Sequence, residues 1–190
     1  MFTEPFQNSN AGGWIEVICG CMFSGKTEEL IRRINRAKIA NQKIIVFKPK
    51  IDNRYHDENV VSHNENMLNA IVIEYAKDII SKVNDQQIVA LDEAQFFDNE
   101  IVEVCNSLAN DGKRIIIAGL DMDSNGKPFG PMPYLLAVAE FVTKLHAICA
   151  VSGNLASYSF RKNESKEPIL VGANEHYEPR SRKYFFKSKG

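Results

Sequence analysis

Hydrophobic and polar positions follow each other in blocks along the chain, and these blocks predict strands alternating with helices. Mainly apolar runs rich in β-branched residues occur at 14–19, 43–48, 87–91 and 114–118. Apolar residues recur every three or four positions at 26–40 and 99–110, which is the spacing of an amphipathic helix. Strands and helices of these kinds in alternation are typical of a parallel sheet that is covered on both faces. We therefore predict an α/β fold.

Three arginines of the 26–40 segment, Arg32, Arg33 and Arg36, alternate with its apolar positions. The simplest interpretation of such a cluster is the solvated face of a helix, because charged side chains are rarely buried. We therefore expect all three arginines to face water.

The pattern changes after Cys149. The segment 157–160 is followed by a polar stretch and then by the apolar run 169–172. This order predicts a hairpin or a long flap, and no helix is expected here. The chain is thus divided into a flexible arm, an α/β domain and a small lobe with a frayed tail, at residues 1–13, 14–149 and 150–190.

Composition narrows the classes of function. Hydrophobic residues make up 44% of the chain and charged residues 25%, and the formal net charge is −1. This near-neutral charge argues against nucleic acid as a partner. No apolar run approaches the roughly 20 residues that span a bilayer, and the N-terminus has no signal-peptide pattern. We expect a cytoplasmic protein with four free thiols, at Cys19, Cys21, Cys105 and Cys149.

A phosphate-binding motif connects the first strand to the first helix. The segment Gly20–Thr27 matches G-x-x-x-x-G-K-T and lies between a predicted strand and a predicted helix, which is the context this motif requires. Its glycines allow backbone N–H groups to surround phosphates at the helix N-terminus. Lys26 would neutralise phosphate charge, and the Thr27 hydroxyl would hold Mg²⁺.

An acidic pair, Asp92 and Glu93, ends the third predicted strand. Asp92 is suited to bind Mg²⁺, and Glu93 could accept a proton from a hydroxyl or from water. Two classes of function remain open at this point: a kinase, or a P-loop ATPase in which Glu93 activates water. Without the phosphate-binding motif, the same pair would be read as a helix cap.

Several aromatic residues lie near these motifs in the sequence. Phe23 and Phe97 are expected in the core, whereas Phe96, Phe129 and Tyr177 fall on predicted loops. A planar ring on a loop could contact a nucleic base, although packing is an equally good explanation.

Together these motifs resemble the thymidine kinase family of bacteria, poxviruses and animal cytosol. The resemblance covers about residues 14–184. It rests on Cys21–Thr27, Asp52–Tyr55, Ser62–His63, Asp92–Phe97, Gly119–Asp121, Lys127–Gly130, Ala139–Glu140 and Lys144–Leu145 followed by Cys149.

The resemblance implies a P-loop NTPase fold of the RecA-like type with a small flap, or lasso, lobe. It also implies an enzyme that transfers the γ-phosphoryl group of ATP to the 5′-hydroxyl of thymidine or deoxyuridine, in the nucleoside salvage that supplies DNA synthesis. Glu93 matches the general base, and Thr27 and Asp92 match the Mg²⁺ positions. Further implications are a homotetramer and feedback inhibition by thymidine triphosphate.

The remaining site residues are assigned by the same resemblance. ATP-binding positions are Gly20, Cys21, Met22, Phe23, Ser24, Gly25, Lys26, Thr27, Asp92 and Gln95. Nucleoside-binding positions are Met22, Arg54, Phe96, Leu120, Phe129, Ile169, Leu170, Val171, Gly172 and Tyr177. Arg161 matches a basic position without a defined role.

One departure from the family concerns structural zinc. The positions that match the family's four ligands are Cys149, Ser152, Ser181 and Tyr184, with His176 nearby. A serine hydroxyl stays protonated near neutral pH and is a poor zinc ligand, while structural zinc needs four good ligands. We therefore expect no zinc here, and a lobe held by packing.

Overall fold

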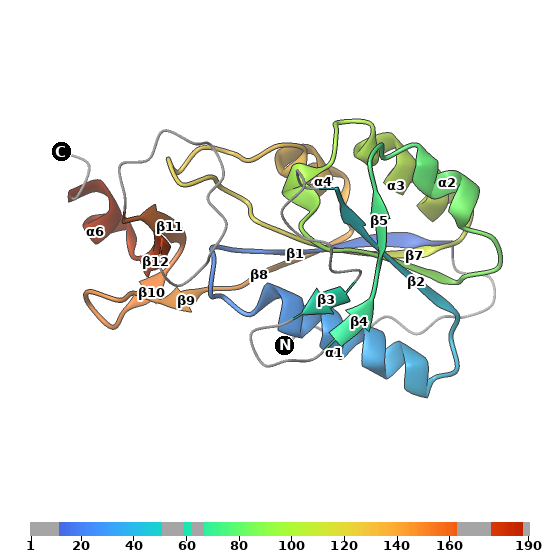
Figure 1. Cartoon of the computed structure of the whole chain (residues 1–190), viewed down its shortest axis with the longest axis horizontal. Coiled ribbons are helices and arrows are strands. Elements are labelled where there is room, and N and C mark those ends of the chain that lie inside the picture. The colour runs from blue at the N-terminus through green and yellow to red at the C-terminus, as the bar shows by residue number, and fades with distance from the viewer. Residues whose placement is uncertain (1–11, 51–58, 62–66, 163–175, 188–190) are drawn as a thin grey trace.

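The structure is a computed structural model that describes residues 12–50, 59–61, 67–162 and 176–187 (Figure 1). Its centre is a six-stranded sheet in the order β5-β2-β6-β7-β1-β8, and every pair of neighbouring strands is parallel. The strands are β1 (Trp14–Cys19), β2 (Ile44–Pro49), β5 (Ile71–Ile73), β6 (Ile88–Leu91), β7 (Arg114–Gly119) and β8 (Phe141–Lys144). The predicted parallel α/β sheet is confirmed.

Helices cover both faces of the sheet, as Figure 1 shows. One face packs against α1, and the other packs against α3 and α4, with α2 lying beside α3. The helices are α1 (Lys26–Ile39), α2 (Asp78–Lys82), α3 (Ile101–Asn110) and α4 (Met132–Val138). Each face has its own apolar core, which is why β1, β6 and β7 are buried along their whole length.

The predicted elements agree with the structure to within one or two residues. The 14–19 strand is confirmed at both ends, and the 43–48 strand is shifted by one residue, so that Pro49 is its last residue. The pattern did not predict β5, β8, α2 or α4, which are short. In β8 the residues alternate between half-buried and exposed, because β8 lies at the edge of the sheet.

The prediction for Arg33 was wrong. Arg32 and Arg36 are exposed, but Arg33 is 0% exposed and its guanidinium donates to Glu16 Oε2 on β1 at 2.8 Å. Arg114 on β7 donates to Glu16 Oε1 at 2.7 Å. A buried carboxylate with two guanidinium partners satisfies the rule that buried charges are paired, and this network joins α1 to the sheet.

Among its described residues, the C-terminal lobe has two antiparallel pairs of strands and the helix α6. The strands are β9 (Ala147–Ile148), β10 (Leu155–Ala156), β11 (Tyr158–Arg161) and β12 (Tyr177–Arg180), and the helix is α6 (Arg182–Lys187). β9 pairs with β10, and β11 pairs with β12. The β9–β10 pair spans the boundary that we expected at 149/150. The expectation of no helix in this region was wrong, because α6 is present.

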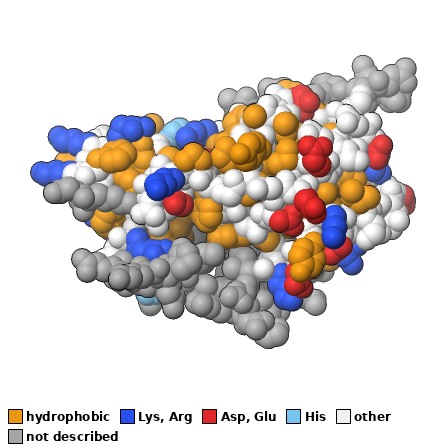
Figure 2. Space-filling model, turned by 90° about the horizontal axis from the view of Figure 1, so that it is seen from above, with side chains coloured by type: hydrophobic (Ala, Val, Ile, Leu, Met, Phe, Trp, Pro, Cys, Tyr) orange, Lys and Arg blue, Asp and Glu red, His pale blue; other side chains and the backbone are white. Residues whose placement is uncertain are grey.

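Packing of Phe185 accounts for α6. This side chain is 0% exposed. Its ring stacks on Tyr158 with 4.5 Å between the ring centroids and meets Phe160 edge-on at 6.3 Å. The guanidinium of Arg180 lies 4.2 Å from the Phe160 centroid, a cation–π contact. Figure 2 shows Lys and Arg side chains gathered over this lobe.

A further pair of strands lies outside the main sheet. The strands β3 (Asn59–Val61) and β4 (Met67–Asn69) form a separate antiparallel pair.

All four cysteines are free and buried, as expected. Of the expected arm, only Gly12 and Gly13 are described, and a side chain at Gly13 would meet the carbonyl oxygen of Lys113 at 2.2 Å. In the described ranges, each helix is too short or too polar to cross a bilayer.

Candidate functional site

The phosphate-binding loop runs from the end of β1 to the start of α1. The backbone has positive φ at Gly20, Phe23 and Gly25, with values of 145°, 66° and 86°. A Cβ atom on Gly20 would lie 2.3 Å from the carbonyl oxygen of Leu145, so glycine is required there on steric grounds. The loop therefore has a tight conformation that requires glycine at Gly20 and positive φ at three positions.

Polar groups of this loop suit an anion. Lys26 opens α1 and donates from Nζ to the carbonyl oxygen of Cys21 at 2.9 Å. The Ser24 hydroxyl is buried and has no hydrogen-bond partner among the described residues. An unsatisfied buried hydroxyl is unfavourable, and a phosphate oxygen would satisfy it. The N-terminus of α1 adds a favourable dipole.

The acidic pair lies at the same edge of the sheet. One strand, β7, separates β6 from β1, and parallel strands end at a common edge, so Asp92 comes near Lys26. Burial, and then the charge of Glu93, raise the pKa of Asp92 to about 7, whereas Lys26 and Lys48 act in the opposite direction. A buried carboxylate of this kind is favoured in its ionised form when a cation binds beside it.

Glu93 has an unusual backbone conformation. Its φ is 52° and its ψ is 41°, the left-handed region that non-glycine residues rarely adopt. Its N–H donates to Asp92 Oδ1 at 3.0 Å, and its carbonyl accepts from the N–H of Phe96 at 3.1 Å. Strained residues of this kind cluster at functional sites.

Gln95, in the short helix η1 (Ala94–Phe96), connects Glu93 to the end of β7. Its Nε2 donates to Glu93 Oε2 at 2.5 Å, and its Oε1 accepts from the N–H of Leu120 at 2.8 Å. The side chain is 2% exposed. The resemblance implied an ATP contact for Gln95, and in the structure its amide is bonded to protein groups on both sides.

A second buried carboxylate, Asp121, was not recognised as a site residue from the sequence. Its Oδ2 accepts from Lys144 Nζ at 2.7 Å, and its Oδ1 is buried without a hydrogen-bond partner among the described residues. The hydrogen bond to Asp121 raises the pKa of Lys144. Asp121 follows β7 and Lys144 ends β8, and these two strands flank β1. The ion pair therefore links the two neighbours of β1 beyond its carboxyl end.

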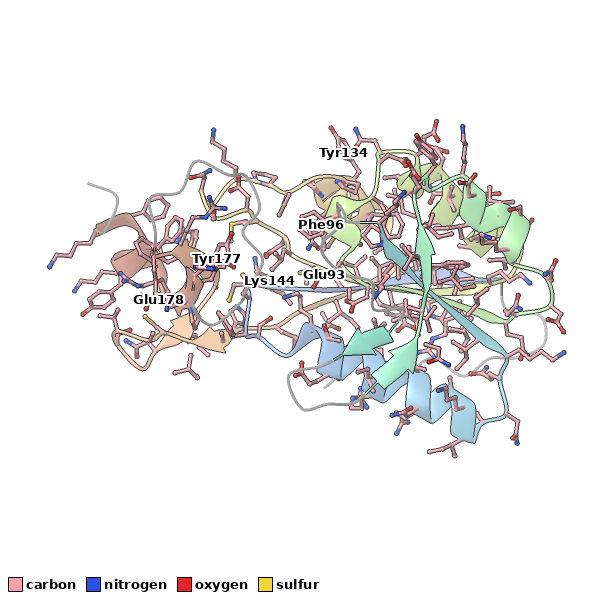
Figure 3. All side chains as sticks on the ribbon, viewed as in Figure 1. Glu93, Phe96, Tyr134, Lys144, Tyr177 and Glu178 are labelled. Atoms are coloured by element: carbon pink, nitrogen blue, oxygen red, sulfur yellow. The ribbon has the colours of Figure 1, made fainter. Side chains whose placement is uncertain are left out.

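Aromatic residues lie beside Glu93. Phe96 and Phe129 are half-buried and meet edge-to-face, with 5.3 Å between their ring centroids. Figure 3 shows Glu93 and Phe96 near the end of the sheet that faces the lobe, with Lys144 and Tyr177 toward the lobe. As expected, Phe97 is in the core. Phe23 is partly buried and packs against the cluster that contains Cys21 and Cys149.

The lobe contacts the phosphate-binding loop directly. The N–H of Met22 donates to the Ser159 hydroxyl on β11 at 3.0 Å, and the Cys21 thiol donates to the carbonyl oxygen of Ala156 at 3.4 Å. Ser159 is 4% exposed. Sequence reasoning missed Ser159, because a serine in a polar and aromatic stretch has no local signal of this contact.

The prediction that Tyr177 lies on a loop was wrong. Tyr177 is the first residue of β12 and is 8% exposed. Its hydroxyl accepts from Arg161 at 2.8 Å, and the Arg161 guanidinium lies 5.4 Å from its ring centroid. Arg54 and the segment 169–172, which were predicted to contact the nucleoside, lie outside the described residues.

The four positions that match the family's zinc ligands come together in the lobe. Burial acts to raise the pKa of the Cys149 thiol, but hydrogen bonds from the Ser152 hydroxyl and from the backbone of Ser181, Val151 and Ser152 lower it to about 6. Tyr184 packs against the cluster that contains Cys149. Within the described ranges, no group of three or more His, Cys, Asp or Glu residues could hold a metal ion.

Comparison with known proteins identifies relatives over nearly the whole chain. The family model described as "Thymidine kinase" matches residues 13–185. A thymidine kinase of Rhodothermus sp. is 55% identical over 184 residues, which cover 96% of this chain and 86% of the relative. A thymidine kinase of Bacteroides thetaiotaomicron is 49% identical over 191 residues, covering 100% of this chain and 96% of that protein.

Solved structures include a more distant likeness. The ATPase DotB of Legionella pneumophila superposes with a TM-score of 0.40 and 15% sequence identity, covering 67% of this chain and 35% of DotB.

Proposed function

We propose a mechanism that proceeds from one premise: the chain belongs to the thymidine kinase family and acts as a thymidine kinase. The observation that carries the mechanism is the position of Glu93. It is held in a strained conformation beside Asp92, at the same edge of the sheet as the phosphate-binding loop. A carboxylate placed there is suited to act on a hydroxyl that attacks a phosphate.

The phosphate donor is ATP, which the loop from Gly20 to Thr27 would bind. The unsatisfied hydroxyl of Ser24 and the backbone N–H groups would donate to phosphate oxygens. Lys26, now directed to the carbonyl of Cys21, would turn to the phosphates and neutralise charge that develops during transfer. Thr27 and Asp92 would hold Mg²⁺, which would neutralise negative charge on the phosphates during transfer.

Glu93 would act as the general base. As the 5′-oxygen of thymidine bonds to the γ-phosphorus, its proton passes to Glu93, the bond from phosphorus to ADP breaks, and dTMP is formed. Base catalysis of this kind contributes about 10²–10⁴-fold to rate. Asp92 is buried and Glu93 is half-buried, and burial strengthens electrostatic effects because the local dielectric is lower than that of water.

The nucleoside would lie between the sheet edge and the lobe. Phe96 and Phe129, which pack edge-to-face with 85° between their ring planes, offer two apolar ring surfaces, one of which could lie against the pyrimidine. Met22, Leu120 and Tyr177 would complete the enclosure, and deoxyuridine would fit the same contacts. Arg54 and the segment 169–172 remain predicted contacts.

The wider biological assignments are also proposals. We infer that the enzyme works in the cytoplasm as a homotetramer and that thymidine triphosphate inhibits it. Light scattering would measure the oligomer. Steady-state kinetics with added thymidine triphosphate would measure the inhibition.

A coupled assay tests the mechanism. The purified chain is given ATP, Mg²⁺ and a panel of nucleosides, and ADP and nucleoside monophosphate are both measured. We expect dTMP and ADP in equal amounts, with thymidine or deoxyuridine as the acceptor. ATP hydrolysis that needs no nucleoside, with no monophosphate formed, would support an ATPase instead.

Substitution of Glu93 tests the base. In Glu93→Gln we expect turnover to fall by about 10²–10⁴-fold with little change in ATP affinity, because Gln has the same shape but cannot accept the proton. Glu103→Gln, at an exposed position of α3, is the matched control and should behave as wild type. Unchanged turnover in Glu93→Gln would remove Glu93 from this role.

A further inference from the structure

We propose that Gln95 is a positioning residue for the phosphoryl transfer: it holds the Glu93 carboxylate in place and couples it to the β7 loop at Leu120. This inference rests on the proposed role of Glu93 as the general base. It assigns Gln95 a function other than contact with ATP.

The hydrogen bonds determine which way the Gln95 amide faces. The N–H of Leu120 can only donate, so the amide oxygen of Gln95 must be the atom that it meets, at 2.8 Å. The amide nitrogen therefore faces Glu93 Oε2, at 2.5 Å. Because this nitrogen can only donate, Glu93 Oε2 must accept, and we assign the proton transfer to Oε1, the oxygen that Gln95 does not contact.

The surroundings hold Gln95 itself in one orientation. Its side chain is 2% exposed, and two glycines allow neighbouring backbone to close around it. A Cβ atom on Gly130 would lie 2.2 Å from the Gln95 carbonyl oxygen, and one on Gly119 would lie 3.0 Å from Gln95 Oε1. The Gly130 contact fixes the Gln95 backbone, and the close approach of Gly119 limits the rotamers open to its amide.

Glu93 needs such a partner because its own backbone conformation is unfavourable. A non-glycine residue at φ 52° is strained and persists only where several contacts hold it. Asp92 holds its N–H, while Gln95 holds its side chain. Loss of the Gln95 contact would let the carboxylate leave the orientation needed for proton transfer, since small misplacements lower rate strongly.

The hydrogen bond between Gln95 and Leu120 fixes the position of Glu93 relative to the proposed nucleoside site. Leu120 is one of the positions proposed to enclose the nucleoside, and its N–H is bonded to the same amide that holds Glu93. A single side chain thus sets the distance between the base and the wall against which the acceptor lies.

The test uses Gln95→Met, which keeps the length of the side chain but removes both hydrogen bonds. We expect kcat to fall about 10–100-fold, the scale on which supporting hydrogen bonds act, with KM for ATP within about threefold of wild type. Gln95→Asn, which keeps the amide but withdraws it by one methylene, provides a second variant if Gln95→Met does not fold. Gln87→Met, at the opposite end of β6 where Gln87 accepts from the N–H of Lys43, is the control and should leave kcat unchanged.

The decisive measurement repeats the Gln95 substitution in Glu93→Gln. If Gln95 acts through Glu93, the second substitution lowers the residual kcat by less than about twofold, because the two effects are not additive. A merely structural role lowers kcat by the same factor in both backgrounds, and that result would overturn the proposal. An unchanged kcat in both Gln95 variants would overturn it as well.

The two proposals fail in different ways. If Glu93→Gln alone keeps full turnover, the assignment of the base is wrong whatever the Gln95 variants do. If Glu93→Gln loses turnover but the Gln95 variants do not, the base stands and only the positioning role is rejected.

Discussion

The six-stranded sheet and the C-terminal lobe are stabilised by different kinds of side chain. In the sheet, β1, β6 and β7 are buried throughout, and their side chains are mainly β-branched aliphatic residues on two continuous cores. In the lobe, the strands are two to four residues long. The lobe depends instead on aromatic rings and arginines around Phe185.

This difference in packing suits the sheet to hold Glu93 rigidly and the lobe to open. The sheet has many mutually supporting contacts and can hold Glu93 in a strained conformation, which a loosely packed region could not do. Isolated two-stranded pairs are marginally stable, so the lobe should open at lower free energy than the sheet. A region that opens is suited to admit and release a nucleoside.

The largest effect should come from Glu16, the charged centre of the sheet region. In Glu16→Ala, the buried Arg33 and Arg114 lose the carboxylate that they share, while Arg33 keeps its ion pair with Glu29. Removing one partner of a buried ion pair costs about 3–5 kcal/mol, because an uncompensated charge remains. We expect this loss in the free energy of unfolding, measured by denaturant titration.

The control for Glu16 is an exposed pair. Asp85 and Lys43 form an ion pair in which both side chains are 64% exposed, and Asp85→Asn should leave the denaturation midpoint unchanged. If Glu16→Ala were as mild as this control, apolar packing alone would hold the sheet, and the network would be dispensable.

The next effect concerns the aromatic centre of the lobe. Phe185→Leu keeps much of the buried volume but removes the ring stacking with Tyr158, a loss of about 1–2 kcal/mol. Because this loss is local, hydrogen exchange should quicken in β11, β12 and α6 and stay unchanged in β6 and β7. Phe186→Leu, at a ring that is 52% exposed, is the control. Equal acceleration in β6 and β7 would show that lobe and sheet unfold together.

The same contrast explains what the sequence could predict. The sheet strands are local runs of aliphatic residues, so β1 was predicted at both ends. Arg33 is buried because it pairs with Glu16, 17 residues earlier, which also pairs with Arg114. Helical spacing gives no information about these partners. The helix α6 contains Tyr184, Phe185 and Phe186 in succession and has no apolar period, so only tertiary packing reveals it.

The candidate site likewise contains residues that local motifs predict and contacts that they do not predict. The phosphate-binding loop, Asp92 and Glu93 are contiguous motifs, and their chemistry follows from residue type and spacing. The contact from Gln95 to Leu120 joins residues 25 positions apart, and the one from Met22 to Ser159 joins residues 137 apart. Such contacts depend on how loops from different strands meet, which no short pattern describes.

A smaller effect is expected from pH, through Cys149. The pKa of its thiol is about 6 in the folded chain and 9.0 ordinarily, so between these values the unfolded chain binds more protons. Stability should therefore rise as pH increases from about 6 to 9 and be lost as pH falls through 6. Cys149→Ser cannot ionise and should lack this rise.

Thermal unfolding of wild type and Cys149→Ser at several pH values measures that difference. Cys105 is a suitable control, because burial raises the pKa of its thiol to about 12. Cys105→Ala should therefore be less stable at every pH but should keep the rise between pH 6 and 9. Parallel pH curves for wild type and Cys149→Ser would show that Cys149 does not ionise in the folded chain.

Removal of metal by a chelator should have no effect on the stability of the wild-type chain. The Cys149 sulfur already accepts hydrogen bonds from Ser152, Ser181 and Val151, and the other matching positions offer only hydroxyl groups, which do not ionise near neutral pH. A chelator should thus leave the unfolding temperature of wild type unchanged. The variant Ser152→Cys, Ser181→Cys and Tyr184→Cys places four thiols at these positions, so it should bind zinc and lose stability with the chelator. About one zinc per chain in purified wild type, measured by elemental analysis, would show that metal and not packing closes the lobe.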